Sequence, residues 1–375
     1  MENDTHAHGL DGGAKVWVLL GAKGGDNAQL LALARALELP FEAKQLTFNG
    51  RHRLPPVLLG ASLASLAGGA DALVPPWPDL VLAAGKRSAP VAHWIATEAA
   101  GRTRLVHLGR PWAPFEWFDL VVTTPQYRLP DAPNLVRVAL PLNDAGGGAG
   151  ADEIERWQQR WKDLPRPWTG VLVGGKSPSY ALTVARARKL AAELDARTER
   201  NGGSALVVTS PRTPADAADA LEHALARPHA LHRFEPGADN PYRALLAVAD
   251  RFAVTADSAS MLAEAAASKR PVRVLSLDSI WSVRFGGLPH PRHAWNAWRS
   301  AARTERDLPG RLYDAAARAG WITPARELGE IHRALGLIDT DGDAIDDVVV
   351  ARELLPAQEL DKVATRVRAL LGETA

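Results

Sequence analysis

Residues 15–37 read KVWVLLGAKGGDNAQLLALARAL, and their pattern indicates the class of fold. Lys15–Leu20 is a short apolar run with β-branched residues, as expected for a buried strand. A glycine-rich turn follows it, and Asn27–Leu37 has the apolar spacing of a helix. A buried strand that passes through glycines into a helix is the first half of a β–α–β unit, from which parallel sheets are built.

This order of strand and helix recurs along the chain in two series. Further strands are predicted at Asp79–Ala83, Arg104–Leu108, Asp119–Thr123, Leu135–Ala139, Thr169–Val173, Ala205–Thr209, Leu231–Phe234, Phe252–Thr255 and Val272–Leu275. Further helices are predicted at Pro55–Leu66, Ser88–Ala100, Tyr180–Arg200, Ala215–Ala226, Tyr242–Ala249 and Ser260–Ser268. The low-complexity run Ala145–Gly150 and the amphipathic stretch Asp152–Leu164 lie between the two series. We therefore expect an α/β protein with two facing Rossmann-like lobes, each built on a parallel sheet.

These boundaries divide the chain into five parts. We expect a disordered leader at 1–13, an N-terminal lobe at 14–144, a linker and connecting helix at 145–165, a C-terminal lobe at 166–277, and a helical and irregular extension at 278–375 that ends in a helix at Ala357–Leu371. The extension is rich in tryptophan, with Trp281, Trp295, Trp298 and Trp321. A helical appendage with half-buried tryptophans is the simpler interpretation, and an interfacial or acceptor-binding surface is the alternative.

Composition excludes several classes of function. The chain of 375 residues has 46% hydrophobic and 23% charged residues, as a globular protein does, and a net charge of +1 from 44 Lys+Arg against 43 Asp+Glu. That balance argues against nucleic acid as a partner. The absence of cysteine excludes disulfides, thiolate nucleophiles and cysteine-based zinc sites. No run of about 18 apolar residues occurs, so we expect no membrane span and a cytoplasmic location, with peripheral contact at the inner membrane left open.

Three strand-to-helix turns carry polar residues at predicted carboxyl ends of strands, where open α/β sheets bind ligands. The first contains Gly24, Gly25, Asp26 and Asn27. On its own it is a weak signal, and a tight turn with a helix cap is its simpler interpretation. The second contains Gly174, Gly175, Lys176 and Ser177. Its glycine N–H groups and one ammonium suit an anion, and a purely structural turn fits about equally well. The third contains Asp257, Ser258 and Ser260 at a helix N-terminus, with Glu264 further along, and an ordinary helix cap is its simpler interpretation.

Two more sites belong to the first lobe. Lys86 and Arg87 open another turn before a helix, and they are candidates to meet an acceptor or the phosphates of a donor, with a solvated basic cap as the alternative. His107 and Arg110 follow at a strand end on the same edge. A structural histidine is the commoner case, so His107 ranks second to Asp26 as a catalytic residue.

Taken together, these turns carry a family resemblance. VLLGAKGGDNAQLLALARAL, DLVLAAGKRSAPVA and TADSASMLAEAAASKRPVRVLSL resemble the mitochondrial-fission-factor family, whose bacterial members are treated as glycosyltransferases of the GT-B architecture. The resemblance covers residues 15–277. More remotely, the turns are similar to the enzyme that adds N-acetylglucosamine to lipid I in peptidoglycan synthesis, which has a glycine-rich first turn ending in His, a GGSxG turn and an SGxxxxxE segment.

The resemblance implies a role for each turn. Ser258 and Ser260 stand in the region that contacts the donor diphosphate, Glu264 matches the acid that holds the ribose, and Gly174, Gly175 and Ser177 match the second-lobe turn. Asp26 stands where the remote family has its candidate base. Asp replaces His there, so the assignment of the base rests on position alone. In the third turn Ala259 replaces a glycine, a mild change.

The resulting hypothesis is a glycosyltransferase that uses a nucleotide sugar, with UDP as the first choice of nucleotide and GDP or CMP as alternatives. Its acceptor would be a cell-envelope glycan or lipid. Helix N–H groups with Ser258, Ser260 and Lys176 would stabilise the leaving diphosphate, so we expect neither a cofactor nor a metal. The DxD-like pair Asp341 and Asp343 lies outside both predicted lobes. The alternative is a non-catalytic scaffold of the same fold that recruits membrane-associated partners. A nucleotide-sugar epimerase is disfavoured, because the first turn lacks GxxGxxG and no Tyr-xxx-Lys pair occurs.

Overall fold

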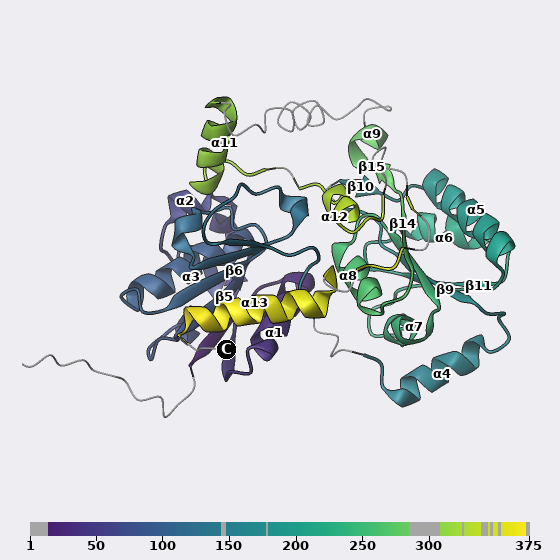
Figure 1. Ribbon diagram of the computed structural model, residues 1–375, viewed down its shortest axis with the longest axis horizontal. Helices are drawn as coiled ribbons and strands as arrows, with labels where there is room; N and C mark the ends of the chain where they lie inside the picture. Colours follow the sequence, from purple (N-terminus) through teal and green to yellow (C-terminus); the bar gives the residue numbers. More distant parts are fainter. Residues whose placement is uncertain are drawn as a thin grey trace, which may run out of the picture.

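The computed structural model describes residues 14–143, 148–177, 179–284, 308–324, 326–338, 344–345, 348–351 and 354–372, and it consists of two α/β lobes side by side (Figure 1). The predicted leader 1–13, Trp295, Trp298, Asp341 and Asp343 lie outside the described residues.

The first lobe is a six-stranded parallel sheet in the order β2-β1-β5-β6-β7-β8. Its strands are β1 Val16–Leu20, β2 Phe41–Gln45, β5 Leu80–Ala84, β6 Arg104–Leu108, β7 Leu120–Thr123 and β8 Leu135–Arg137, with a small hairpin of β3 Thr47–Phe48 and β4 Leu66–Gly68 beside them. Its helices are α1 Gly24–Ala36, α2 Pro56–Leu59 and α3 Gly85–Glu98. The strand order reverses between β1 and β5, so the ends of these two strands open a crevice.

The second lobe is a five-stranded parallel sheet in the order β12-β11-β9-β13-β14. Its strands are β9 Trp168–Val173, β11 Ser204–Thr209, β12 His229–His232, β13 Arg251–Thr255 and β14 Val272–Leu275, and a short antiparallel pair joins β10 Tyr180–Ala181 to β15 Asp278–Ser279. Its helices are α4 Ala151–Trp161, α5 Val184–Asn201, α6 Ala215–Ala224, α7 Tyr242–Val248 and α8 Ala259–Ala267. Here the switch point lies between β9 and β13.

The C-terminal extension is shared between the lobes. It contains α9 Ile280–Arg284, α11 Leu308–Arg318, α12 Gly329–Ala334 and α13 Pro356–Leu370. Ile331 of α12 is fully buried in the core of the second lobe, whereas Val363 and Val367 of α13 are fully buried in that of the first. Helix α13, yellow in Figure 1, lies across the first lobe and packs on α1 and α8. Its Arg368 donates a hydrogen bond to the Ala36 carbonyl (2.5 Å) at the end of α1.

Both sheets are covered on two faces, so their central strands are apolar throughout, as in β5, where Leu80, Val81 and Leu82 have no exposed surface. The predicted α/β class is confirmed: two Rossmann-like lobes with parallel sheets and a helical C-terminal extension, the GT-B architecture. No helix in the described part of the chain combines the length and the apolar character needed to span a bilayer.

Three local predictions were wrong. The helix predicted over Pro55–Leu66 stops at Leu59, because Gly60 (φ +59°) turns the chain out of the helical region. The helix predicted from Tyr180 begins at Val184, because Tyr180 and Ala181 pair with β15. The glycines at 24 and 25 form the first turn of α1 rather than the turn before it, with Lys23 as the N-cap residue.

Candidate functional site

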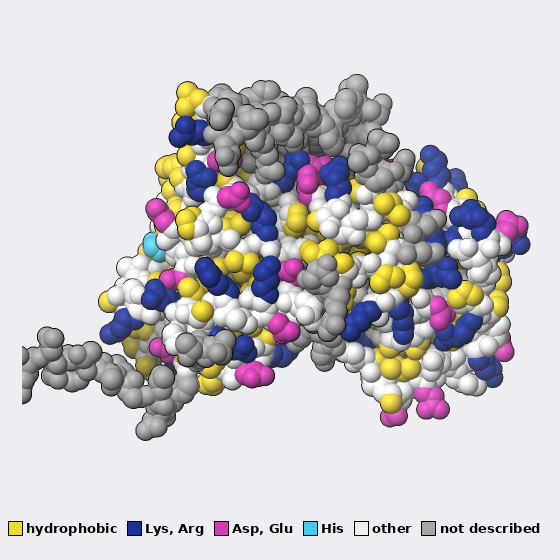
Figure 2. All heavy atoms as spheres, in the orientation of Figure 1, with side chains coloured by type: hydrophobic (Ala, Val, Ile, Leu, Met, Phe, Trp, Pro, Cys, Tyr) yellow, Lys and Arg dark blue, Asp and Glu magenta, His cyan; other side chains and the backbone are white. Residues whose placement is uncertain are grey.

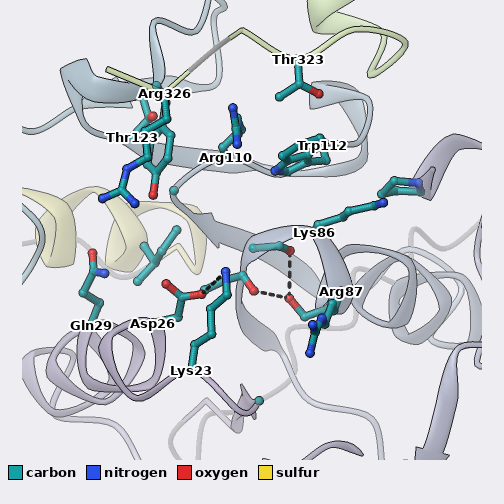
Figure 3. A pocket seen from close by; sticks show the side chains of 18 of the residues that line it. Lys23, Asp26, Gln29, Lys86, Arg87, Arg110, Trp112, Thr123, Thr323 and Arg326 are labelled. Carbon is teal, nitrogen blue, oxygen red and sulfur yellow. Dashed lines mark hydrogen bonds and ion pairs between the residues drawn. The ribbon is translucent and has the colours of Figure 1, made fainter. Parts of the chain in front are cut away.

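A cavity of about 1070 Å³ opens at the carboxyl ends of β1, β5, β6 and β7. Asp26, Lys86 and Arg87 line it from the first lobe, as predicted for ligand-facing turns, and Figure 3 shows them around it. Part of the C-terminal extension, from Tyr313 to Arg326, closes the cavity from the other side. The cavity therefore lies at the switch point of the first sheet, where open α/β sheets bind ligands.

The first turn is locked by the side chain of Asn27. Its Nδ2 donates to the Gly21 carbonyl (2.8 Å) and its Oδ1 accepts from the Gly21 N–H (3.0 Å). Asp26 is thereby turned toward the cavity, with its carboxylate 3.7 Å from Lys23 Nζ and 35% exposed. A Cβ placed on Gly85 would lie 3.4 Å from Asp26 Oδ2, so the β1–α1 and β5–α3 turns meet at this carboxylate. Asn27 thus supports the turn, and Asp26 is the carboxylate that faces the cavity.

The first turns of α1 and α8 approach each other across the two lobes. A Cβ placed on Gly25 would lie 3.6 Å from Ser260 Oγ, an ordinary van der Waals contact. The N-cap residue Lys23 makes no side-chain cap to α1, whereas Ser258 Oγ accepts from Met261 N (3.4 Å) in α8. Two helix N-termini, each with uncompensated N–H groups and partial positive charge, therefore converge on one point.

His107 lies beneath the cavity rather than in it. It is fully buried on β6, its Nε2 donates to the Gly85 carbonyl (3.2 Å), and its ring packs against Phe118. Burial lowers the pKa of His107 from 6.5 to about 4, so the imidazole is neutral at physiological pH. In this arrangement His107 supports the β5–α3 turn, and it does not line the cavity.

The buried histidines His107 and His332 should make the folded protein less stable in mild acid. Burial also lowers the pKa of His332 from 6.5 to about 4, with Arg333 adding to the shift. The unfolded chain therefore binds more protons than the folded chain between these pH values, and the free energy of unfolding should decrease as pH falls through them. At pH 5 we expect a loss of about 2 kcal/mol for each histidine, measured by urea unfolding at pH 7.5 and 5. His107→Gln should remove its share of the pH dependence, and an unchanged dependence would contradict the assignment.

The second-lobe turn is organised by the buried carboxylate of Asp257. Its Oδ2 accepts from Gly175 N (3.0 Å) and pairs with Arg212 Nη1 (2.7 Å), and its Oδ1 accepts from Thr255 Oγ1 (2.7 Å). A Cβ on Gly174 would lie 2.2 Å from Asp257 Oδ1, so only glycine fits there. The side chain of Asp257 is fully buried, so its role in the fold is to fix the shape of this turn.

The other predicted donor-side residues surround this turn. Lys176 has an exposed side chain, and its N–H donates to the Arg212 carbonyl (3.0 Å). Ser177 Oγ accepts from Tyr180 N (3.1 Å). Glu264 is held by a hydrogen bond from the Tyr242 hydroxyl, and burial raises the pKa of its carboxyl. None of the eight donor-side residues lines the first-lobe cavity.

Several residues of the site had no signal in the local sequence. Arg212 and Tyr242 hold Asp257 and Glu264 from other elements. Arg326 lines the cavity from the C-terminal extension, with its Nε bonded to Gln126 Oε1 (2.5 Å). Trp112, with φ +60°, lies next to Arg110, which the HLGRP motif had placed at this edge. Only the fold brings these side chains together.

Comparison with known proteins identifies the family of this chain. A family model described as mitochondrial fission ELM1 matches residues 24–324. A mitochondrial fission protein of Arabidopsis thaliana is 24% identical over 229 residues, which is 55% of this chain and 53% of that protein, so the chain spans about half the length of this relative. An uncharacterized protein of Rickettsia prowazekii (strain Madrid E) is 22% identical over 316 residues, covering 73% of this chain and 85% of its own.

Among solved structures, a UDP-GlcNAc 2-epimerase from Neisseria meningitidis bound to UDP-GlcNAc has a TM-score of 0.49 at 12% identity and covers 96% of this chain and 100% of its own. A glycosyltransferase from Rickettsia africae has a TM-score of 0.45 at 10% identity, with the same coverage. The ADP-heptose heptosyltransferase II of E. coli has a TM-score of 0.41 at 14% identity and covers 69% and 84%. At such identities, functional roles must be argued from the residues of this chain.

Proposed function

The chain belongs to the mitochondrial fission ELM1 family, and from that premise and its two-lobed fold we propose that it is a metal-independent glycosyltransferase. It would move a sugar from a nucleotide-sugar donor to a cell-envelope glycan or lipid-linked acceptor. The observation that carries the proposal is the approach of Gly25 to Ser260, where the N-termini of α1 and α8 face each other. Such a point suits a diphosphate, whose charge offsets two helix dipoles at once.

The donor would lie on the second lobe. Its phosphates would meet the N–H groups of α8 with Ser258 and Ser260, and its ribose diol would donate to Glu264, one helical turn beyond Ser260. The turn at Gly174–Gly175 would close over the other side, held in place by Asp257. Lys176, which is free to swing from its exposed position, would add one positive charge.

The chemistry would take place between the two helix N-termini. Asp26 would accept the proton of the acceptor hydroxyl as that oxygen forms its bond to the anomeric carbon. The bond from that carbon to the donor phosphate would break, and the nucleoside diphosphate would leave with the electron pair. Its developing charge would be stabilised by N–H groups that are already oriented.

Nucleotide binding provides the first test. UDP at about 100 times its Kd should stabilise the fold by about 2.7 kcal/mol and raise Tm by several degrees, with GDP and CMP as the alternatives. We expect the same shift in EDTA as with Mg²⁺, because the proposed phosphate site consists of N–H groups, hydroxyls and Lys176. A shift that depends on the metal would contradict metal independence. No shift with any nucleotide at millimolar concentration would instead favour the scaffold, and a donor sugar inverted at one carbon, seen by NMR, would indicate an epimerase.

A lipid-linked acceptor would require the cavity to approach a membrane. Leu308 and Leu312 lie one helical turn apart on α11 and are 65% and 63% exposed, and Trp321, at the cavity, is 66% exposed. Figure 2 shows apolar side chains in yellow over α11 at the upper left, beside basic ones in blue. Exposed leucines with a tryptophan beside cations match the composition of surfaces that bind anionic lipid. We infer that this face, Leu308, Leu312 and Trp321, rests on the membrane surface.

Flotation with vesicles tests this face. The protein should float with phosphatidylglycerol vesicles, and the triple variant Leu308→Ser, Leu312→Ser, Trp321→Ser should bind them at least about tenfold more weakly, since each large apolar side chain contributes on the order of 1 kcal/mol or more when buried. Val349→Ser, at a 57% exposed position outside this face, is the control and should bind as the parent does. Equal flotation of parent and triple variant would rule out this surface.

A further inference from the structure

The cavity of the first lobe is strongly basic. Six of its lining residues are Lys or Arg, and Asp26 is the single carboxylate among the lining residues that the structure describes: Lys23, Arg53, Lys86, Arg87, Arg110 and Arg326 supply the positive charge. The whole chain carries a net charge of only +1. The positive charge is therefore concentrated at this cavity rather than spread over the molecule.

Arg110 is a half-buried cation, and none of the described residues forms an ion pair with it. One guanidinium nitrogen donates to the Pro324 carbonyl, the plane stacks 4.2 Å from the centre of the Trp112 ring, and Nε has no hydrogen-bond partner. Burial lowers its pKa from 12.5 to about 10, and the nearby Arg326 adds to the shift. No carboxylate of the described residues lies within 4 Å of it. A partly desolvated cation of this kind is stabilised when an anion enters the cavity.

Among the described residues, only neutral groups hold Lys86 and Arg326 near Arg110. Lys86 Nζ donates to the Arg53 carbonyl (2.8 Å) and lies 5.7 Å from the Trp112 ring. The Arg326 guanidinium lies 5.8 Å from the centre of the Tyr127 ring. The Arg110 guanidinium lies 5.5 Å from the centre of the same ring. Carbonyls and rings fix the positions of these cations without neutralising them, so the positive charge remains available to a ligand.

We propose that this cavity binds the acceptor by a phosphate group, held by Lys86, Arg110 and Arg326, a step that rests on the proposed function. Guanidinium groups bind phosphate through two parallel hydrogen bonds, and the Trp112 ring offers a flat apolar surface to the rest of the acceptor. Figure 3 shows Arg110 and Trp112 across the cavity from Asp26. An acceptor whose phosphate is held at Arg110 would therefore present a hydroxyl to Asp26.

This site is distinct from the one proposed for the donor diphosphate. The donor site lies where Gly25 meets Ser260, and no side chain of α8 lines the cavity. The three cations belong instead to the β5–α3 turn, the segment after β6 and the C-terminal extension. The geometry thus provides two anion sites, one for each substrate, with Asp26 between them.

Calorimetric titration with octyl phosphate, below its micelle concentration and with UDP at saturation, tests the proposal. Octyl phosphate should still bind when UDP is bound, whereas the neutral octyl glucoside and the carboxylate octanoate should bind at least tenfold more weakly. Arg110→Gln and Lys86→Gln should each lower the affinity for octyl phosphate at least tenfold without changing the affinity for UDP. Arg270→Gln removes a guanidinium that is likewise bonded to backbone carbonyls, at Leu246 and Ala247 of the second lobe, and should change neither affinity.

The outcomes separate the two proposals. Displacement of octyl phosphate by UDP would overturn the second anion site, and equal binding of octanoate or octyl glucoside would overturn recognition of phosphate. Unchanged affinity for octyl phosphate in a folded Lys86→Gln protein would also overturn the phosphate site. This variant keeps the test valid if Arg110→Gln fails to fold. Binding of octyl phosphate without any binding of UDP would support the phosphate site and refute the proposed donor site.

Discussion

Asp26→Asn should lower the turnover of glycosyl transfer by about 10²- to 10⁴-fold, the usual contribution of a positioned general base. The amide has almost the same size as the carboxylate and cannot accept the proton of the acceptor hydroxyl. Asp26 lies in the first turn of α1, beside Gly85 and facing the cavity. Since the proton leaves only in the transition state, donor affinity should stay within about a factor of two. Turnover with a radiolabelled donor and donor Kd by calorimetry measure the two quantities.

Glu264→Ala provides the contrast. Its carboxylate would bind the ribose in ground and transition states alike, so its loss should weaken donor binding by about 10- to 100-fold, as expected for a hydrogen bond to a charged group. Asp131→Asn, at an 89% exposed side chain of the first lobe, is the matched control for Asp26→Asn. It should change neither turnover nor donor affinity. Because Asp26 and Glu264 lie on different lobes, their effects should add unless closure of the lobes couples them.

Full turnover in Asp26→Asn would refute the base assignment. His107, the second candidate from the sequence, would not replace it in this conformation, because its ring is buried and bonded to the Gly85 carbonyl. A loss of turnover in Glu264→Ala without any change in donor affinity would mean that the roles of the two lobes are reversed.

Asp257→Ala should lower the free energy of unfolding by about 2–4 kcal/mol, because two buried hydrogen-bond donors lose their acceptor, at about 1–3 kcal/mol each. The substitution leaves the Arg212 guanidinium, the Gly175 N–H and the Thr255 hydroxyl without their shared acceptor. The Gly174–Gly175 turn would lose its shape, so UDP affinity should fall as well. Urea unfolding, followed by tryptophan fluorescence, measures the first effect.

Asp239→Ala is the control for this prediction. Asp239 also pairs with two arginines, Arg156 and Arg160, but its side chain is 46% exposed. Water screens such a pair, so its loss should cost less than about 1 kcal/mol. Equal effects of the two substitutions would contradict the structural role assigned to Asp257.

Much of the fold was predictable because it depends on local pattern. Continuous apolar runs such as Val16–Leu20 are buried on both faces of a parallel sheet, and glycines mark where strands pass into helices. Strand β2, with the sequence FEAKQ, was missed because it lies at the edge of the sheet and has four exposed residues out of five. Apolar periodicity cannot reveal a strand that buries so little of its surface.

The site was predictable in position but not in detail. The rule that ligands bind at carboxyl ends of strands led to Asp26 and Lys86, which do line one cavity. It could not tell which polar residues face a ligand and which hold the turn. Asn27 binds Gly21, His107 lies under Gly85, and Asp257 turns inward, because each is committed to partners that only the fold supplies.

Helix α13 determines when the molecule can complete its fold during synthesis. Val363, Ala364 and Val367 belong to the same apolar cluster as Val16, Leu30 and Leu82, although the whole second lobe lies between them in sequence. A growing chain that has released only residues 14–143 from the ribosome has an open hydrophobic face where α13 will pack. That face must stay exposed, or be shielded by a chaperone, until residue 370 has emerged. The lobe that is made first is therefore completed last.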